Sequence, residues 1–158
     1  MPTKMPLRPD ARILTRWHKM LGLQRQTPAC WHRARLREEL RERRLATTSL
    51  ARVSETSDVL FTISRAAHDG FPVCRRPPFA HFHNGLAYVY MLAKYTSRWG
   101  FYRMAALLCG APDAASVREV VNPAKDSKLD EVAVRHGIDL AAFRRVGRTL
   151  RCVWPLLP

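Results

Sequence analysis

The clearest folding signal in this chain is the stretch LDEVAVRHGIDLAAFRRV, residues 129–146. Apolar residues recur at helical spacing up to Gly137, a residue type that commonly ends a helix in the left-handed conformation. Asp139 then has a side chain suited to capping the start of another helix. The stretch therefore predicts two short helices joined by a tight turn, and the second helix is rich in arginine.

The helix that follows the turn has two chemically different sides when its residues are placed at about 100° intervals. One side is apolar and consists of Phe143, Val146, Leu150 and Trp154. Gly147 lies beside these residues, and because glycine costs about 1 kcal/mol relative to alanine inside a helix, it predicts close approach of another helix. A separate arc of about 120° carries four arginines, namely Arg144, Arg145, Arg148 and Arg151.

Residues 129–148 resemble the helix-turn-helix motif of repressors. That motif has a small residue four positions before the turn glycine, an apolar residue after it, and apolar residues on the inner side of the second helix. The matching residues are Ala133, Gly137, Ile138, Phe143 and Val146. His136 departs from the pattern, because its position in the family is usually apolar. The resemblance implies that the second helix contacts nucleic acid.

The arginine arc is chemically suited to phosphate, since guanidinium stays charged and can bind two oxygens at once. Base contacts in this motif come mainly from the first turn of the second helix, which offers only Asp139, Leu140 and Ala141. The acid repels phosphate, and the apolar residues reach at most a thymine methyl group. We therefore expect little sequence preference and strong salt dependence. An ordinary structural corner or a protein contact remains an alternative.

The composition indicates a soluble globular protein with a large positive charge. The 158 residues fit one domain, and 27 basic against 13 acidic residues give a net charge of +14 and a pI of about 10.8. Arginine accounts for 22 of the basic residues. Such an excess attracts polyanions, whether nucleic acid, an anionic membrane or an acidic protein, although a GC-rich genome also enriches arginine.

The remaining sequence predicts an all-α fold, with a single compact helical bundle over residues 28–158. No segment alternates like a strand, and the proline-rich residues 70–84 predict a loop. The apolar residues 85–109 predict a helical hairpin, or one helix interrupted near residues 96–100, whose aromatic side chains pack in the core. Further helices are expected to begin at Pro28 after a Thr27 cap, near Ser57, at Ser116 and at Ser127.

The helix expected after Pro28 interleaves arginine with glutamate and has few apolar residues, chiefly Leu36 and Leu40. Glu39 lies four positions from both Arg35 and Arg43, a spacing that allows weak ion pairs on a helix surface. The pattern therefore predicts a solvated charged face, and the intervening acids are unlike a nuclear-import cluster.

Residues 1–27 predict a basic amphipathic arm. In a helical projection, the apolar side comprises Ile13, Leu14, Trp17, Met20 and Leu21. Arg12, Arg16 and Lys19 lie on the other side. Three interpretations remain open, namely a helix docked on the domain, a mitochondrial-type presequence, and a membrane-surface anchor.

No residue pattern predicts catalysis, a cofactor or a metal site. The sequence contains no nucleotide-binding glycine loop, no HExxH pattern and no nucleophile motif. Cys74, His81 and His83 offer metal-binding atoms, but their spacing matches no zinc finger and a fourth ligand is not evident. We therefore expect a protein that is not an enzyme and that uses no cofactor.

Isolated cysteines favour a reducing, intracellular compartment, and the sequence does not distinguish the nucleus from the mitochondrion. The four cysteines form no CxxC pair or disulfide framework. The chain has no apolar run long enough to span a membrane, and its start lacks the apolar stretch of a secretory signal.

Several longer stretches are similar to a set of small filamentous-fungal proteins that carry no assigned activity. They are LREELRERRLATTSLARVSETSDVLFTISRA, YMLAKYTSRWGFYR, REVVNPAKDSKLDEVAVRHGID and VWPLLP, within residues 31–158. This resemblance implies no site and no partner. It implies only that the folded unit excludes about the first thirty residues.

Two functions follow from these patterns. The first is a non-enzymatic basic binding protein that contacts nucleic acid through Arg144, Arg145, Arg148 and Arg151, with little sequence specificity. The second is an adaptor that binds an acidic protein or an organelle surface through the arm at residues 1–27. The sequence does not predict an oligomeric state.

Overall fold

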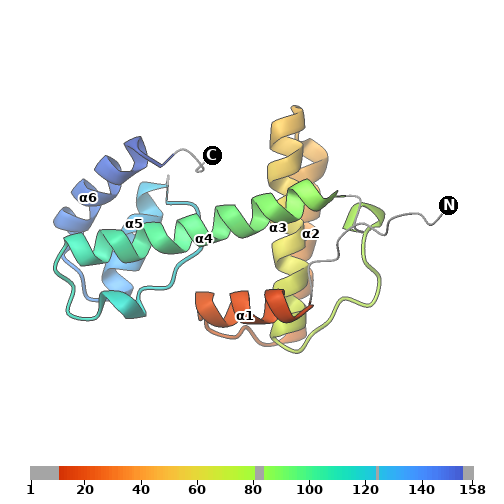
Figure 1. Cartoon of the computed structure of the whole chain (residues 1–158), viewed down its shortest axis with the longest axis horizontal. Coiled ribbons are helices and arrows are strands. Elements are labelled where there is room, and N and C mark those ends of the chain that lie inside the picture. Colours follow the sequence, from red (N-terminus) through yellow and green to blue (C-terminus); the bar gives the residue numbers. More distant parts are fainter. Residues whose placement is uncertain (1–10, 81–83, 124, 155–158) are drawn as a thin grey trace. The chain divides into compact units, whose positions relative to one another are not determined.

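A computed structural model describes residues 11–80, 84–123 and 125–154, which form helices and connections without a strand (Figure 1). The expected all-α fold is confirmed. The six α-helices are α1 Ala11–Leu21, α2 Ala29–Leu45, α3 Ser49–His68, α4 Gly85–Leu108, α5 Asp126–Arg135 and α6 Leu140–Cys152. Short 3-10 helices lie at η1 Pro78–Ala80 and η3 Ala114–Ser116. No helix in the described part of the chain is long and apolar enough to cross a membrane.

The chain divides into two compact units, Met1–Leu92 (unit 1) and Ala93–Pro158 (unit 2), and α4 contributes residues to both. The helix expected within the arm at residues 1–27 is α1, and it packs on α3 in unit 1. Each unit has its own buried side chains and is described separately below.

Unit 1 is built around α2 and α3, which lie side by side (Figure 1). Thr48 caps α3 by accepting a hydrogen bond from the Ala51 amide at 3.1 Å. The prediction that this helix begins near Ser57 is therefore wrong, because Thr48 caps it and the helix already begins at Ser49. The α2 helix begins at Ala29 with Pro28 at its N-cap position, so the expected Thr27 cap is also absent.

Most charged residues of α2 are exposed, as expected of a solvated face, but two titratable side chains of this helix are buried. Glu39 is 2% exposed and His32 is 4% exposed. Arg43 Nε donates a hydrogen bond to Thr56 Oγ1 of α3 at 2.8 Å, and its guanidinium lies over the Phe79 ring. This interface is polar because short hydroxyl-bearing side chains of α3 leave room for the long charged ones of α2.

The α1 helix packs on α3, as expected of a docked helix. Leu21 is fully buried, and Trp17 contacts the Phe61 ring edge-on with centroids 5.9 Å apart. His18 is also buried, and its Nε2 lies 3.0 Å from Ser64 Oγ. The buried side is rotated from the expected one, because it includes His18 while Ile13 is 54% exposed.

The segment after α1 is fixed to α3 by two charged residues. Arg65 Nη2 donates hydrogen bonds to the Leu23 and Gln24 carbonyls at 3.1 and 2.5 Å. Arg65 Nε also donates to Asp69 Oδ2 at 3.0 Å, and the same carboxylate oxygen accepts from the Gln26 amide. These bonds make residues 22–26 part of unit 1.

Unit 2 has a core formed by the second half of α4 with α5 and α6. The fully buried large side chains include Phe101, Tyr102, Val117, Leu129 and Phe143. The α4 helix is continuous, so the expected hairpin or interruption is wrong. Its backbone is helical on both sides of Gly100, and Phe101 and Tyr102, which follow this position, are fully buried in the unit 2 core.

The helix expected to begin at Ser116 is absent, and a single 3-10 turn ends there. Ser116 Oγ donates to the Asp113 carbonyl at 2.9 Å, so it does not act as the predicted capping acceptor. Val117 and Val120 are buried and anchor the following connection. The next helix, α5, begins one residue earlier than expected, at Asp126.

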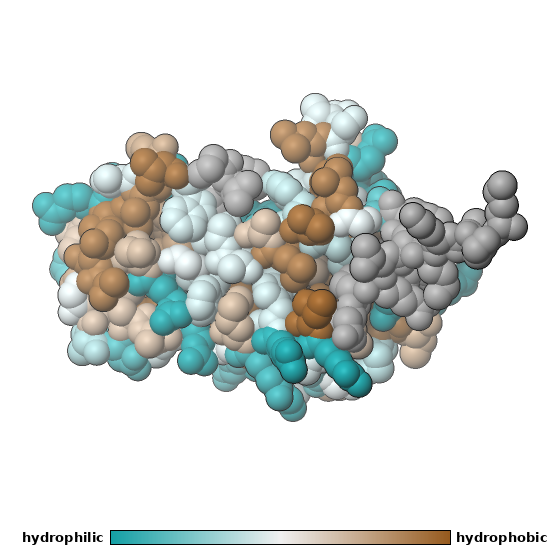
Figure 2. Space-filling model, viewed as in Figure 1, coloured by the Kyte–Doolittle hydropathy of each residue, from teal (hydrophilic) through white to brown (hydrophobic). Residues whose placement is uncertain are grey.

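Hydrophobic residues gather on the unit 2 surface near the end of α4 and along α6 (Figure 2). The exposed apolar side chains of these helices include Met104, Leu107, Leu108 and Val153. These apolar side chains carry no charge that could bind a phosphate group, and they are distinct from the arginines of α6.

Candidate nucleic-acid interface

The α5–α6 corner has the geometry predicted from its sequence. Gly137 has a φ of 64°, and the Ile138 amide donates to the Ala133 carbonyl at 2.9 Å across the turn. Asp139 accepts a hydrogen bond from the Ala142 amide at 2.7 Å and caps α6. Ala133 and Phe143 are fully buried. The turn and its inward-facing residues are thus confirmed as a packed helical corner.

Gly147 lies where α6 passes closest to α5. A Cβ atom at this position would lie 2.9 Å from Leu129 Cδ2 and 3.0 Å from Leu129 Cδ1, closer than packed carbons approach. Leu129 is fully buried. The predicted close approach of another helix is therefore confirmed, and it fixes which side of α6 faces away from the core.

The flank of α6 beside this contact carries Arg144, Arg145, Arg148 and Arg151, which we name the α6 arginine face. Three of these arginines form ion pairs with α5. Arg144 makes a two-pronged pair with Asp130, with Nε and Nη2 donating at 2.6 and 2.5 Å. Asp126 accepts from Arg148 at 2.8 Å and from Arg151 at 2.7 Å. Internal ion pairs therefore engage three of the four guanidiniums that the sequence analysis assigned to phosphate contact.

The two aspartates lie four residues apart on α5, so both face α6, and this spacing was the signal that the sequence analysis missed. Hydrogen bonds from Arg148 hold the pKa of Asp126 below its usual value. A hydrogen bond from Arg144 does the same for the pKa of Asp130. Both carboxylates therefore stay ionised through the neutral pH range.

The ion pairs of the α6 arginine face remain open to solvent. The Arg148 side chain is 57% exposed and its partner Asp126 is 46% exposed. Arg145 is exposed and makes no ion pair with any residue that the structure describes. Ion pairs at such a surface contribute little to stability and are weakened by salt. Four arginines against two aspartates leave this face positively charged.

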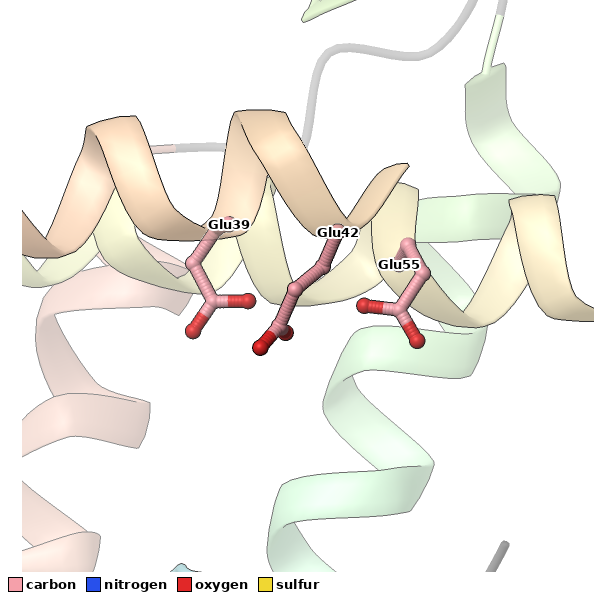
Figure 3. A group of neighbouring side chains, drawn as sticks. All are labelled: Glu39, Glu42 and Glu55. Atoms are coloured by element: carbon pink, nitrogen blue, oxygen red, sulfur yellow. The ribbon is translucent and has the colours of Figure 1, made fainter. Parts of the chain in front are cut away.

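A second group of charged residues lies between α2 and α3 in unit 1 (Figure 3). Carboxylate oxygens of Glu39, Glu42 and Glu55 lie within 4.8 Å of one another. Burial raises the pKa of Glu39 to about 7, although Arg35 Nη2 pairs with it at 2.6 Å. Carboxylates can bind hard cations, but here Glu39 is engaged by Arg35, and no further feature of this cluster indicates an ion.

The metal-binding atoms considered in the sequence analysis are only partly described. Cys74 is exposed in the loop before η1. His81 and His83 lie outside the described residues. All four cysteines of the chain are free, and burial raises the pKa of Cys109.

Comparisons of the chain with family models, with curated proteins and with solved structures found no match. The similarity of residues 129–148 to the helix-turn-helix motif, and of the longer stretches to small filamentous-fungal proteins, therefore stays a prediction.

Proposed function

We propose that this chain is a non-enzymatic protein that binds nucleic acid through the α6 arginine face with little sequence specificity. The observation that carries the proposal is the segregation of the face, since its arginines occupy an arc of α6 separate from the arc of the buried Phe143 and Gly147. The net charge of +14 supports it, because a positive excess raises the local concentration of polyanions.

The aspartates of α5 are compatible with phosphate binding. A guanidinium has five N–H donors, and each of the paired arginines uses only one or two of them on an aspartate. The ion pairs also hold the long side chains in place, which reduces the conformational entropy lost on binding. The cost is repulsion between aspartate and phosphate, so we expect weak binding that declines steeply with salt.

Low sequence specificity is expected from the start of α6. Asp139 is occupied as the helix cap, and Leu140, which is 37% exposed, can offer only an apolar contact. Arginines that follow this first turn reach the phosphate backbone, which fixes position on a duplex but does not distinguish base pairs. Duplexes of unrelated sequence should therefore bind with similar affinity.

The proposal is tested with two variants, one that removes arginines of the α6 arginine face and one that removes the aspartates of α5 that pair with it. Arg145→Gln with Arg148→Gln should weaken binding of a DNA duplex and reduce the slope of log affinity against log salt by up to about 2. Asp126→Asn with Asp130→Asn should strengthen binding, because the repulsive charges are removed while hydrogen-bond acceptors remain. Unchanged affinity and slope in both variants would refute the proposal.

The adaptor function stands as a second candidate, and the exposed side of α1 favours it. Ile13 is 54% exposed and Met20 is 40% exposed, beside the exposed Arg16 and Lys19. An acidic protein or organelle surface could be bound by this mixed apolar and basic side. Because α1 is packed into unit 1, Arg16→Glu with Lys19→Glu is a better test than deletion. The adaptor function requires this variant to change cellular location without unfolding, and an unchanged location counts against it.

A further inference from the structure

The outward side of α2 carries four exposed arginines in a row. They are Arg33, Arg37, Arg41 and Arg44, and we name them the α2 arginine stripe. At about 100° per residue they occupy an arc of about 80°, and at about 1.5 Å rise per residue they extend over roughly 16 Å. The stripe lies in unit 1 and is therefore independent of the α6 arginine face.

The acidic residues of α2 lie away from the stripe. Glu38, Glu39 and Glu42 are displaced from its nearest member by about 60° or more around the helix. Glu38 and Glu39 are both bound by Arg35, at 2.7 and 2.6 Å. The glutamates of α2 therefore provide no neutralising charge along the stripe, although they alternate with arginine in the sequence.

The guanidiniums of the stripe are left to solvent. None of them has an ion pair or hydrogen bond with a side chain in residues 11–80, 84–123 or 125–154. Arginines four residues apart repel each other and destabilise an isolated helix. That repulsion would be relieved by an anion that contacts several members of the row at once.

We propose that the α2 arginine stripe binds the phosphate backbone of a nucleic-acid duplex, as a second contact surface beyond the α6 arginine face. Guanidinium binds phosphate through two parallel hydrogen bonds, and a straight helix presents such groups at regular intervals. The row fits a regular array of phosphates along a rigid strand.

Other partners fit the stripe less well. Binding of a flexible single strand usually needs aromatic side chains for base stacking, and exposed Trp31 lies about 80° around the helix from the nearest arginine of the stripe. Membrane binding needs apolar residues along the helix, whereas the strongly exposed Leu45 lies at the end of α2. The chemistry along the row is that of phosphate contact.

The test measures how the affinity of the full-length chain for a DNA duplex depends on salt. Changing all four stripe arginines to glutamine should lower the slope of log affinity against log salt by about 3 to 4, since each phosphate contact contributes about 0.9. Changing them to lysine should retain most of the slope. An unchanged slope in the glutamine variant overturns the inference.

A variant with Arg144, Arg145, Arg148 and Arg151 changed to glutamine is the matched control, because it removes the same charge from unit 2. If only this variant loses slope, the inference about α2 is wrong and the proposed function of α6 is supported. If the slope falls only in the stripe variant, the inference about α2 is supported and the proposed function of α6 is wrong. Circular dichroism of the stripe variant should match the wild type, because its substituted side chains make no internal bonds, and circular dichroism of the α6 variant checks that loss of its surface ion pairs leaves the helices intact.

Cys30 gives a second measurement that needs no arginine substitution. It is exposed and lies within the same arc of α2, three residues before Arg33. A duplex bound to the stripe should slow alkylation of Cys30 and leave the exposed loop residue Cys74 unaffected. Vesicles containing phosphatidylserine and a polyglutamate peptide serve as rival anions. Protection of Cys30 by either rival, without protection by the duplex, overturns the inference.

Discussion

Glu39 shows how strongly one residue's environment can depart from what its neighbours in sequence indicate. It lies in a run of alternating charges, yet it is 2% exposed and burial raises its pKa from 4.5 to about 7. A carboxyl group whose pKa is higher in the folded protein stabilises the fold when protonated. This contribution is fully present below pH 4.5 and is lost as the pH rises through about 7.

Glu39→Gln should therefore raise the free energy of unfolding at pH 8, by up to roughly 3 kcal/mol at 1.36 kcal/mol per pKa unit. It should also flatten the dependence of stability on pH between 4.5 and 7. Urea denaturation across this pH range measures both effects. Glu38→Gln is the matched control, because the Glu38 side chain is 53% exposed. Similar pH profiles for Glu39→Gln and the wild type would contradict the assignment.

Substitution by alanine is expected to change the free energy of unfolding in opposite directions at Gly147 and Gly100. At Gly147 a Cβ atom would lie 2.9 Å from Leu129, whereas at Gly100 the nearest atom is Trp154 Cη2 at 4.0 Å. Overpacking costs about 1–3 kcal/mol and the helix propensity of alanine returns about 1 kcal/mol. Gly147→Ala should thus lower the free energy of unfolding by up to about 2 kcal/mol, while Gly100→Ala should raise it by about 0.5–1 kcal/mol. Thermal unfolding measures both, and equal shifts would contradict the packing described for α6.

At the scale of elements, the packing of α1 on α3 depends on a neutral histidine. Burial, together with the neighbouring His68 and Arg65, lowers the pKa of His18 from 6.5 to about 4, while Asp69 opposes the shift. The His18 and His68 rings stack with centroids 4.9 Å apart. A base whose pKa is lowered in the folded protein loses its stabilising contribution as the pH falls from 6.5 towards 4.

An NMR titration of the imidazole signals tests this directly. The His18 signal should titrate with a midpoint near pH 4, and α1 amide protons should exchange faster as that midpoint is approached. His18→Asn should reduce the acid sensitivity of α1. A midpoint near 6.5 would contradict the burial of His18 against α3.

Elements defined by local signals were predictable from the sequence, and those defined by distant contacts were not. The α5–α6 corner followed from Gly137 and Asp139, which act within a few residues of their own positions. The continuity of α4 through Gly100 depends on a core that no local pattern reveals. The start of α3 was missed because the signals near Ser57 resembled a cap, although Ser57 Oγ donates to the Ser54 carbonyl inside the helix.

The candidate site shows the same distinction. The arc of arginines on α6 could be derived from helical spacing alone, and it is present in the structure. Its ion pairs with Asp126 and Asp130 were not predicted, because they join residues separated by 14 to 25 positions and depend on how α5 packs against α6. The four-residue spacing of the two aspartates on α5 was the one local signal for them. The α2 arginine stripe required the structure too, since only the burial of Glu39 shows which charges face solvent.

At the scale of the whole molecule, each compact unit presents its own arginine-rich surface, one on α2 and one on α6. Much of the acidic charge close to these surfaces is bound by arginine, as in the Arg35–Glu39 and Arg144–Asp130 pairs. Exposed guanidiniums of the two surfaces therefore contribute to the net charge of +14. Affinity for nucleic acid should follow ionic strength more closely than base sequence.

Alkylation of Cys152 in the presence of a DNA duplex reports whether α6 contacts nucleic acid. Cys152 is exposed at the end of α6 and lies about 180° from Phe143 around the helix, within the arc of the α6 arginine face. At low salt the duplex should slow its reaction, while Cys74 reacts at an unchanged rate, and added salt should remove the protection. Equal reactivity of Cys152 in the free chain and in the duplex-bound chain would contradict the proposed role of α6.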